Sequence, residues 1–326
     1  MRAQTINDWA FAKILLGYFA FSCVLFVAGF LFPENDIGYL NTIPALLSVL
    51  LLIPIYAWYR NYRKKTELSQ KIEGKGKSAV LFWSLLLFLL ALAIRIPSVL
   101  IFGKPYEKTP LIFLTIATIL AIEKTSVSAF GFKTRSFGKS LLYGFLFFFF
   151  LNGLAFILTW LLFYVFTSQI PILYYDVVPF LLTMPFMTLC VGISEEGFFR
   201  GYMQTHLEKV YTPKKAILMQ AVLFGFWHFV WNLQPFEPFG MIQYVLSTFF
   251  IGLLFGYFYL KTRNLTPLIF AHGLFNSVSQ GIVHNQSADT IFQTIPAYSQ
   301  ILTLILPYII AAVLTVLFVK YLAREI

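Results

Sequence analysis

Long apolar runs dominate this sequence, and they constrain its fold more than any other feature. The chain has 326 residues, of which 59% are hydrophobic and only 12% are charged. A soluble domain carries about 25% charged residues, whereas a helix needs about 20 mostly apolar residues to cross the hydrocarbon core of a bilayer. The sequence therefore predicts an all-α fold, a polytopic integral membrane helical bundle that has the lipid bilayer as its surroundings.

Ten runs are candidate membrane spans. They cover residues 11–32, 39–59, 79–102, 110–122, 140–166, 177–207, 214–233, 241–260, 264–283 and 299–321. The fourth run is shorter than a typical span, so a re-entrant or tilted segment is the alternative there. We expect about ten transmembrane helices, within a range of eight to ten, and a count of nine would reverse the sidedness of every later span.

The positive charge is distributed unevenly between the loops that ten spans would create. The formal net charge is +10, and with the N-terminus inside nearly all lysines and arginines fall in cytoplasmic segments, above all in the loop 60–78. This is the bias of the positive-inside rule. We therefore expect a multi-pass protein of the cell membrane with both termini in the cytoplasm. The bias accounts for the basic excess, so no support remains for nucleic-acid binding.

Three charged side chains interrupt the apolar run 177–207, namely Glu195, Glu196 and Arg200. Each costs roughly 2.5–3.5 kcal/mol in the middle of a membrane unless it is compensated. On a helix Glu196 and Arg200 lie four residues apart in the favourable order for an ion pair. Glu195 points about 100° away, where a buried carboxylate can serve as a general base. A purely structural charge cluster is the alternative.

Polar side chains also occur in two later runs: His228 in the seventh, and His272 with Asn276 in the ninth. His272 and Asn276 are four apart and share one helix face. From the rise per residue, Glu195 and His228 lie about 21 Å from the cytoplasmic helix ends, Asn276 about 19 Å and His272 about 14 Å. Each alone also suits interhelical hydrogen bonding. Their similar depth predicts one shared site, reached from the cytoplasmic side.

These residue types suit the hydrolysis of a peptide bond by water. A carboxylate and an imidazole can activate the water, while a second imidazole and a carboxamide can stabilise an oxyanion. Two histidines and a glutamate are also a familiar zinc-binding set, here Glu195, His228 and His272. The residues themselves leave open whether a metal takes part. Neither HExxH nor GxSxG occurs, and the two cysteines lie in apolar runs, where we expect no disulfide.

Arg95 and two tryptophans within these runs also need an explanation. Arg95 in the third run is expected to pair with an acidic group or to extend toward the interface. Trp227 and Trp231 are four apart in the seventh run. We expect them to pack against neighbouring helices, or to line a groove for an apolar substrate.

Three short motifs together resemble those of one family: Glu195-Glu196-xxx-Arg200, Phe224-xxx-His228 and His272-xxx-Asn276. This is the CPBP family, the CAAX proteases and bacteriocin-processing enzymes that carry the Abi domain and include type II CAAX prenyl endopeptidases. The resemblance covers about residues 139–284. It implies that Glu195 and His228 activate the attacking water, that His272 and Asn276 hold the oxyanion, and that Glu196 and Arg200 support them. It favours a glutamate mechanism without a cofactor, with zinc as the alternative.

The resulting hypothesis is an intramembrane endopeptidase. We divide the chain into N-terminal spans and basic loops (1–138), a protease core (139–284) and a C-terminal transmembrane helix (285–326). The expected substrate is a peptide or protein at the membrane: a CAAX-type C-terminus, a bacteriocin or signalling-peptide precursor, or another membrane protein. The alternatives are a non-catalytic scaffold or bacteriocin self-immunity protein, and a transporter with a proton path, which would need broken helices in corresponding halves. Nothing in the sequence indicates the oligomeric state.

Overall fold

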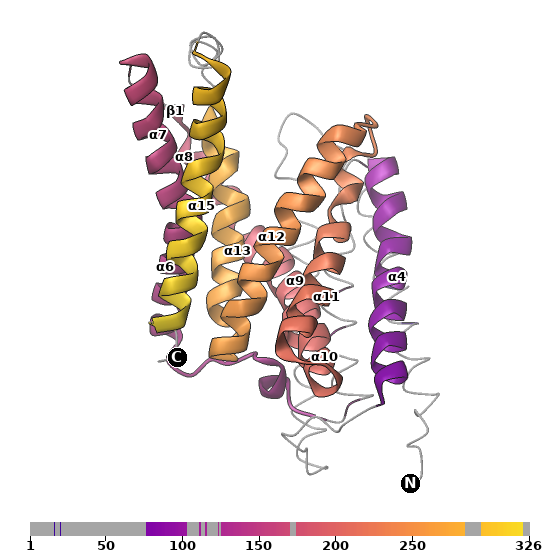
Figure 1. Ribbon diagram of the computed structural model, residues 1–326. Coiled ribbons are helices and arrows are strands. Elements are labelled where there is room, and N and C mark those ends of the chain that lie inside the picture. The colour runs from indigo at the N-terminus through magenta and orange to yellow at the C-terminus, as the bar shows by residue number, and fades with distance from the viewer. Residues whose placement is uncertain are drawn as a thin grey trace, which may run out of the picture.

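The computed structural model describes residues 16, 20, 76–102, 111, 115, 123, 125–169, 174–283 and 295–321 of the chain. These residues form a bundle of helices that run side by side (Figure 1). The described strands are β1 (Tyr174–Tyr175) and β2 (Ile282–Val283), which pair antiparallel. The predicted all-helical membrane fold is confirmed for this part of the chain, apart from that two-residue pairing.

The helices fall into three kinds. The α-helices are α4 (Lys77–Phe102), α6 (Phe137–Phe148), α7 (Leu154–Thr167), α8 (Val177–Phe186), α9 (Ile193–Glu196), α10 (Thr205–Val210), α11 (Pro213–Trp227), α12 (Pro238–Thr262), α13 (Thr266–Val278) and α15 (Ala297–Tyr321). The π-helical segments are η2 (Phe149–Gly153), η3 (Met187–Gly192) and η4 (Gly197–Gln204). The 3-10 turns are η1 (Val127–Phe130), η5 (Phe229–Asn232) and η6 (Ser279–Gly281).

Five helical stretches of the described chain are long and apolar enough to cross a membrane. They are Lys77–Ile101, Phe137–Thr167, Val177–Val210, Pro238–Thr262 and Ala297–Tyr321. These stretches correspond to the third, fifth, sixth, eighth and tenth predicted spans. The first, second and fourth predicted spans lie outside the described residues, apart from residues 16, 20, 111 and 115.

The other two predicted spans, 214–233 and 264–283, do not form continuous spanning helices. Helix α11 has 15 residues and ends at Trp227, and α13 has 13 residues and ends at Val278. At 1.5 Å per residue they are about 22 and 20 Å long, shorter than the roughly 30 Å hydrocarbon core. Each helix is followed by a 3-10 turn, η5 or η6. The run after α11 stays largely apolar through η5, so hydropathy does not mark the end of that helix, whereas the polar sequence Ser-Gln-Gly of η6 does mark the end of α13.

The lysines of the described helices gather at one end of the bundle. The first turns of α4, α6 and α11 and the last turns of α10, α12 and α15 lie together at the lower end in Figure 1. All six turns carry lysine: Lys77, Lys139, Lys214, Lys209, Lys261 and Lys320. The acidic residues that precede α8 and α12, Asp176 and Glu237, lie at the other end. This separation agrees with the loop charge bias in the sequence.

Small residues and buried amides hold the central helices together. Helix α12 packs along α11, where a Cβ at Gly252 would lie 3.1 Å from the Cα of Ala221. The Gln220 side-chain amide donates to the Gly252 carbonyl oxygen at 2.9 Å, and that of Gln204 donates to the Gly256 carbonyl oxygen, also at 2.9 Å. Close backbone approach and polar contacts of this kind drive helix association in membranes, where the hydrophobic effect between helices is absent.

Gly144 on α6 offers a test of the packing between α6 and α13. A Cβ at Gly144 would overlap the Pro267 carbonyl oxygen, whereas a Cβ at Gly138 on the same helix would meet nothing within 4 Å. We predict that Gly144→Ala destabilises the protein by about 1–3 kcal/mol, since overpacking of this kind forces the backbones apart. The melting temperature in detergent should fall for Gly144→Ala. It should hold or rise slightly for Gly138→Ala, and equal melting temperatures would contradict the packing described above.

Candidate active site

The stretch that carries the two glutamates is not a uniform α-helix. Glu195 and Glu196 lie in the four-residue helix α9, with the π-helical segments η3 and η4 on either side. π-Helical turns are rare and occur frequently at functional sites. All of η4 is buried, and its residues Phe198 and Phe199 belong to a hydrophobic cluster of the described helices. The glutamates therefore lie in the interior of the protein and not on a lipid-facing surface.

The ion pair expected between Glu196 and Arg200 is confirmed. Arg200 Nη1 donates to Glu196 Oε1 at 3.1 Å, and both side chains are fully buried. The guanidinium lies over the rings of Phe224 and Phe255, with its central carbon 4.1 and 5.2 Å from their centroids. Aromatic faces attract a cation, so they replace part of the hydration that Arg200 loses.

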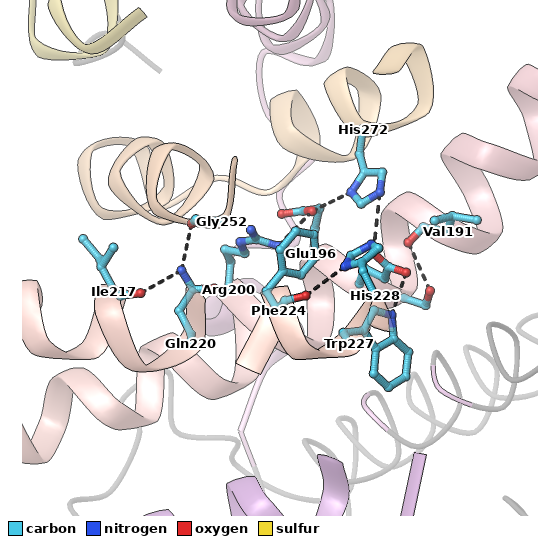
Figure 2. Close-up of polar contacts among 12 residues, drawn as sticks. Val191, Glu196, Arg200, Ile217, Gln220, Phe224, Trp227, His228, Gly252 and His272 are labelled. Atoms are coloured by element: carbon cyan, nitrogen blue, oxygen red, sulfur yellow. Dashed lines mark hydrogen bonds and ion pairs between the residues drawn. The ribbon is translucent and has the colours of Figure 1, made fainter. Parts of the chain in front are cut away.

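Glu196 has a second partner that its position in the sequence does not indicate. His272 Nδ1 on α13 lies 2.7 Å from Glu196 Oε1 (Figure 2). An ionised carboxylate can only accept a hydrogen bond, so Nδ1 carries the hydrogen of this contact. In the neutral imidazole Nε2 then carries the lone pair. Glu196 therefore fixes the orientation of His272 as well as compensating Arg200.

Glu195 faces both histidines. Its Oε1 accepts a hydrogen bond from Trp227 Nε1 at 2.9 Å. Its Oε2 lies 3.8 Å from His228 Nε2 and 3.6 Å from His272 Nε2. The predicted meeting of three helical segments is therefore present, with Glu195 from α9, His228 directly after α11, and His272 from α13.

The hydrogen bond of His228 defines its tautomer. Nδ1 lies 2.8 Å from the Phe224 carbonyl oxygen, which can only accept. The hydrogen is therefore on Nδ1, and in the neutral imidazole Nε2 presents its lone pair toward Glu195. A neutral His228 and an ionised Glu195 would then offer two neighbouring acceptors to the protons of one water molecule. His272 Nε2 faces the same space.

The ligand set predicted for the zinc alternative shows a mixed fit. Two imidazole nitrogens and a carboxylate are donors that zinc prefers. Across the described ranges, however, no group of three or more His, Cys, Asp or Glu side chains is arranged to hold a metal ion.

Asn276 stands apart from the hydrogen-bonded cluster. It lies one turn after His272 on α13 and is partly buried. Its backbone carbonyl accepts from Ser279 Oγ at 3.2 Å. No hydrogen bond links its carboxamide to another residue in the described part of the chain. The structure thus places Asn276 on the same helix as His272 but does not test its predicted oxyanion role.

The sequence did not predict that Trp227 and Arg95 contact this cluster. Trp227 was expected to pack or to line a groove, although a buried indole N–H usually finds an acceptor, and its neighbour His228 was already a candidate. Arg95 was expected to pair with an acid or to extend toward the interface. The predicted extension of Arg95 toward the interface is wrong, because this residue is fully buried. Its guanidinium carbon lies over the Trp227 ring, 4.3 Å from the centroid.

A cavity of about 360 Å³ lies next to the cluster, between η5 and the first half of α12. Tyr244 connects the cavity to the cluster, because it lines the cavity and its ring meets the His228 ring edge-on with centroids 5.6 Å apart. The cavity lies toward the first turn of α12, away from the lysine-rich end. The depth of the polar residues predicted that the site is reached from the basic, cytoplasmic end. This cavity instead lies toward the opposite end. Its walls are uncharged: Trp231, Asn232, Gly240, Gln243, Tyr244 and Ser247.

Residues 177–278 match the sequence model of a family described as type II CAAX prenyl endopeptidase Rce1-like. The resemblance drawn from the three motifs is confirmed for this segment, and the activity it indicates is that of an intramembrane CAAX protease. The segment runs from α8 to α13 and includes both glutamates and both site histidines, whereas α4 lies outside it. Comparisons with curated proteins and with solved structures found no match.

The buried ion pair predicts a large difference between two arginine substitutions. Arg200→Met leaves the Glu196 carboxylate buried without its cation, which should cost about 3–5 kcal/mol of stability. The matched control is Arg263→Met, because Arg263 pairs with Glu208 but is 43% exposed. A pair at the surface contributes about 1 kcal/mol or less. Unfolding of both variants in detergent should show this difference, and equal losses of stability would argue against a critical Glu196–Arg200 pair.

Proposed function

We propose that this chain is an intramembrane endopeptidase that hydrolyses a peptide bond of a membrane-associated peptide or protein. The observation that carries the proposal is the approach of Glu195 Oε2 to the Nε2 atoms of His228 and His272, at 3.8 and 3.6 Å. The match of residues 177–278 to a prenyl endopeptidase family supports the reaction class. This segment lies within the core that the motifs define, residues 139–284.

In the proposed mechanism Glu195 and His228 act as the general base. A water molecule between Glu195 Oε2 and His228 Nε2 transfers a proton to one of them as its oxygen attacks the scissile carbonyl carbon. The same group then returns the proton to the leaving amine nitrogen. General acid–base catalysis of this kind contributes about 10²–10⁴-fold in rate. No covalent bond forms between the enzyme and the substrate.

The oxyanion of the tetrahedral intermediate requires hydrogen-bond donors, for which we propose His272 and Asn276. His272 Nδ1 already donates to Glu196, so Nε2 donates only when the imidazole is protonated. The Asn276 carboxamide can donate in its only state. Its place one turn from His272 on α13 supports this pairing. A donor of this type is worth about 10²–10³-fold in the catalytic rate constant.

For the substrate we propose a peptide whose residues beside the scissile bond enter the cavity near His228. The carboxamides and hydroxyl groups that line the cavity suit a peptide main chain, because burying them against an apolar chain would leave them unsatisfied. The family description favours a prenylated CAAX-type C-terminus. Bacteriocin or signalling-peptide precursors are the other classes that the motifs allow. A non-catalytic scaffold or bacteriocin self-immunity protein remains the alternative function.

We also propose a location in the cell membrane with both termini in the cytoplasm. The support is the shared end of the bundle at which six lysine-bearing helix turns meet. Lysine and arginine are enriched on the cytoplasmic side of membrane proteins.

The central prediction is that Glu195→Ala and His228→Ala each reduce peptidase activity by at least about 100-fold, because each removes a proton acceptor. The measurement uses proteoliposomes and a fluorescence-quenched peptide with a farnesylated CAAX end, together with the same peptide without the lipid. Glu208→Gln is the matched control, since Glu208 lies on α10 outside the cluster. Peptide profiles of membranes containing wild type or Glu195→Ala extend the test to native substrates.

Full activity of either variant on both peptides would overturn the assignment. Identical peptide profiles of the two membranes would favour the scaffold instead.

The metal question has its own prediction. Without a metal requirement, purified protein should keep its activity after treatment with 1,10-phenanthroline, and elemental analysis should find less than one zinc per chain. Loss of activity that zinc restores would instead support the alternative in which Glu195, His228 and His272 bind the ion. Zinc retention by Glu195→Ala and wild type should then differ.

A further inference from the structure

The Trp227 indole joins the candidate active site to a helix outside the matched segment. Its side chain is fully buried, and its N–H donates to Glu195 Oε1 at 2.9 Å. An indole nitrogen can only donate, so this contact fixes the direction of the bond. The acceptor is the oxygen of Glu195 that does not face the histidines.

Two side chains of helix α4 contact this indole. The Arg95 guanidinium carbon lies 4.3 Å from the Trp227 ring centroid, and the Phe88 ring centroid lies 6.0 Å away. Phe88 and Arg95 are seven residues apart, which places them two turns apart on one helix face. Phe199 of η4 also contacts the indole, with centroids 5.7 Å apart. The indole is therefore enclosed on several sides.

A buried arginine in a spanning helix calls for a physical reason. Arg95 lies within Lys77–Ile101, one of the five stretches apolar enough to span, and its side chain is 0% exposed. Ionisable residues at such positions are costly and usually functional. The cation over the indole face is stabilised by the ring quadrupole. In turn, its positive charge lies close to the indole whose N–H points at the Glu195 carboxylate.

We propose that Trp227 is a positioning residue for Glu195 and that Arg95 of α4 acts through the indole to hold it in place. This inference rests on the proposed function. The terminal torsion of a glutamate side chain is broad, so the carboxylate rotates freely unless a partner fixes one oxygen. The Trp227 bond to Oε1 leaves Oε2 directed at His228 and His272. The α4 segment thereby takes part in the geometry of the active site.

Kinetics separate this role from ordinary packing. A misoriented Glu195 still permits substrate binding but activates water less often, so kcat falls while KM stays the same. Trp227→Phe keeps a ring and removes the donor. We expect a loss in kcat of about 10- to 100-fold, the range for a lost hydrogen bond to a charged group. Trp160→Phe on α7 is the matched control, because it makes the same substitution away from the site.

Substitutions of Arg95 provide the second part of the test. Arg95→Met should lower kcat, whereas Arg95→Lys, which keeps the charge, should recover part of the rate. If Arg95 acts through the indole, then Arg95→Met in the Trp227→Phe background should cause little further loss in kcat. A merely structural arginine would lower the melting temperature in both backgrounds, and its effect on kcat would add to that of Trp227→Phe.

All variants are measured as full-length protein in proteoliposomes with the quenched farnesylated peptide, beside Glu195→Ala, with melting temperatures in detergent. Wild-type kcat in folded Trp227→Phe, while Glu195→Ala is inactive, overturns this inference and leaves the proposed function intact. Full activity of Glu195→Ala overturns the proposed function itself. If Trp227→Phe does not fold, the Arg95 pair decides: reduced kcat in Arg95→Met with recovery in Arg95→Lys supports the proposal, and unchanged kcat in Arg95→Met overturns it.

Discussion

The rest of the site depends on the buried ion pair between Glu196 and Arg200. Both side chains are fully buried in an apolar helical stretch, where either charge alone would be costly. Their contact at 3.1 Å compensates the charges and leaves Glu196 Oε1 able to accept from His272 Nδ1 as well. One carboxylate oxygen thus holds α13 against α9. Without this pair, the remaining polar groups would have no fixed frame in the membrane interior.

Irregular helices bring the reactive groups together. The π-helical segments η3 and η4 flank the two glutamates, and α11 ends at Trp227 so that His228 begins a turn. A regular spanning helix would satisfy every backbone group internally. At the end of α11 the His228 backbone N–H donates to the Gly225 carbonyl oxygen. The Nδ1 atom of the His228 ring donates to the Phe224 carbonyl oxygen. The site therefore lies where the helical pattern is locally interrupted, and the cavity beside Tyr244 adjoins that interruption.

The boundaries of the matched segment and of the polar network differ. The match covers residues 177–278, but the indole that contacts Glu195 is enclosed by Phe88 and Arg95 of α4. The residues proposed to act on the substrate and those that hold them thus come from different parts of one chain. Division of the chain at residue 138 describes the motifs well and separates α4 from the site that it contacts.

Hydropathy and residue spacing were enough to predict the membrane fold, the position of five spanning stretches and the pairing of Glu196 with Arg200, because these are local properties of the chain. The sequence also brought Glu195, His228 and His272 into one hypothesis through their depth. The contacts of His272 with Glu196, 76 residues away, and of Trp227 with Glu195, 32 residues away, became visible only in the folded protein. The tertiary structure also decided that Arg95 turns inward and that α11 ends early. These features arise from packing between helices, which no periodicity within one helix can specify.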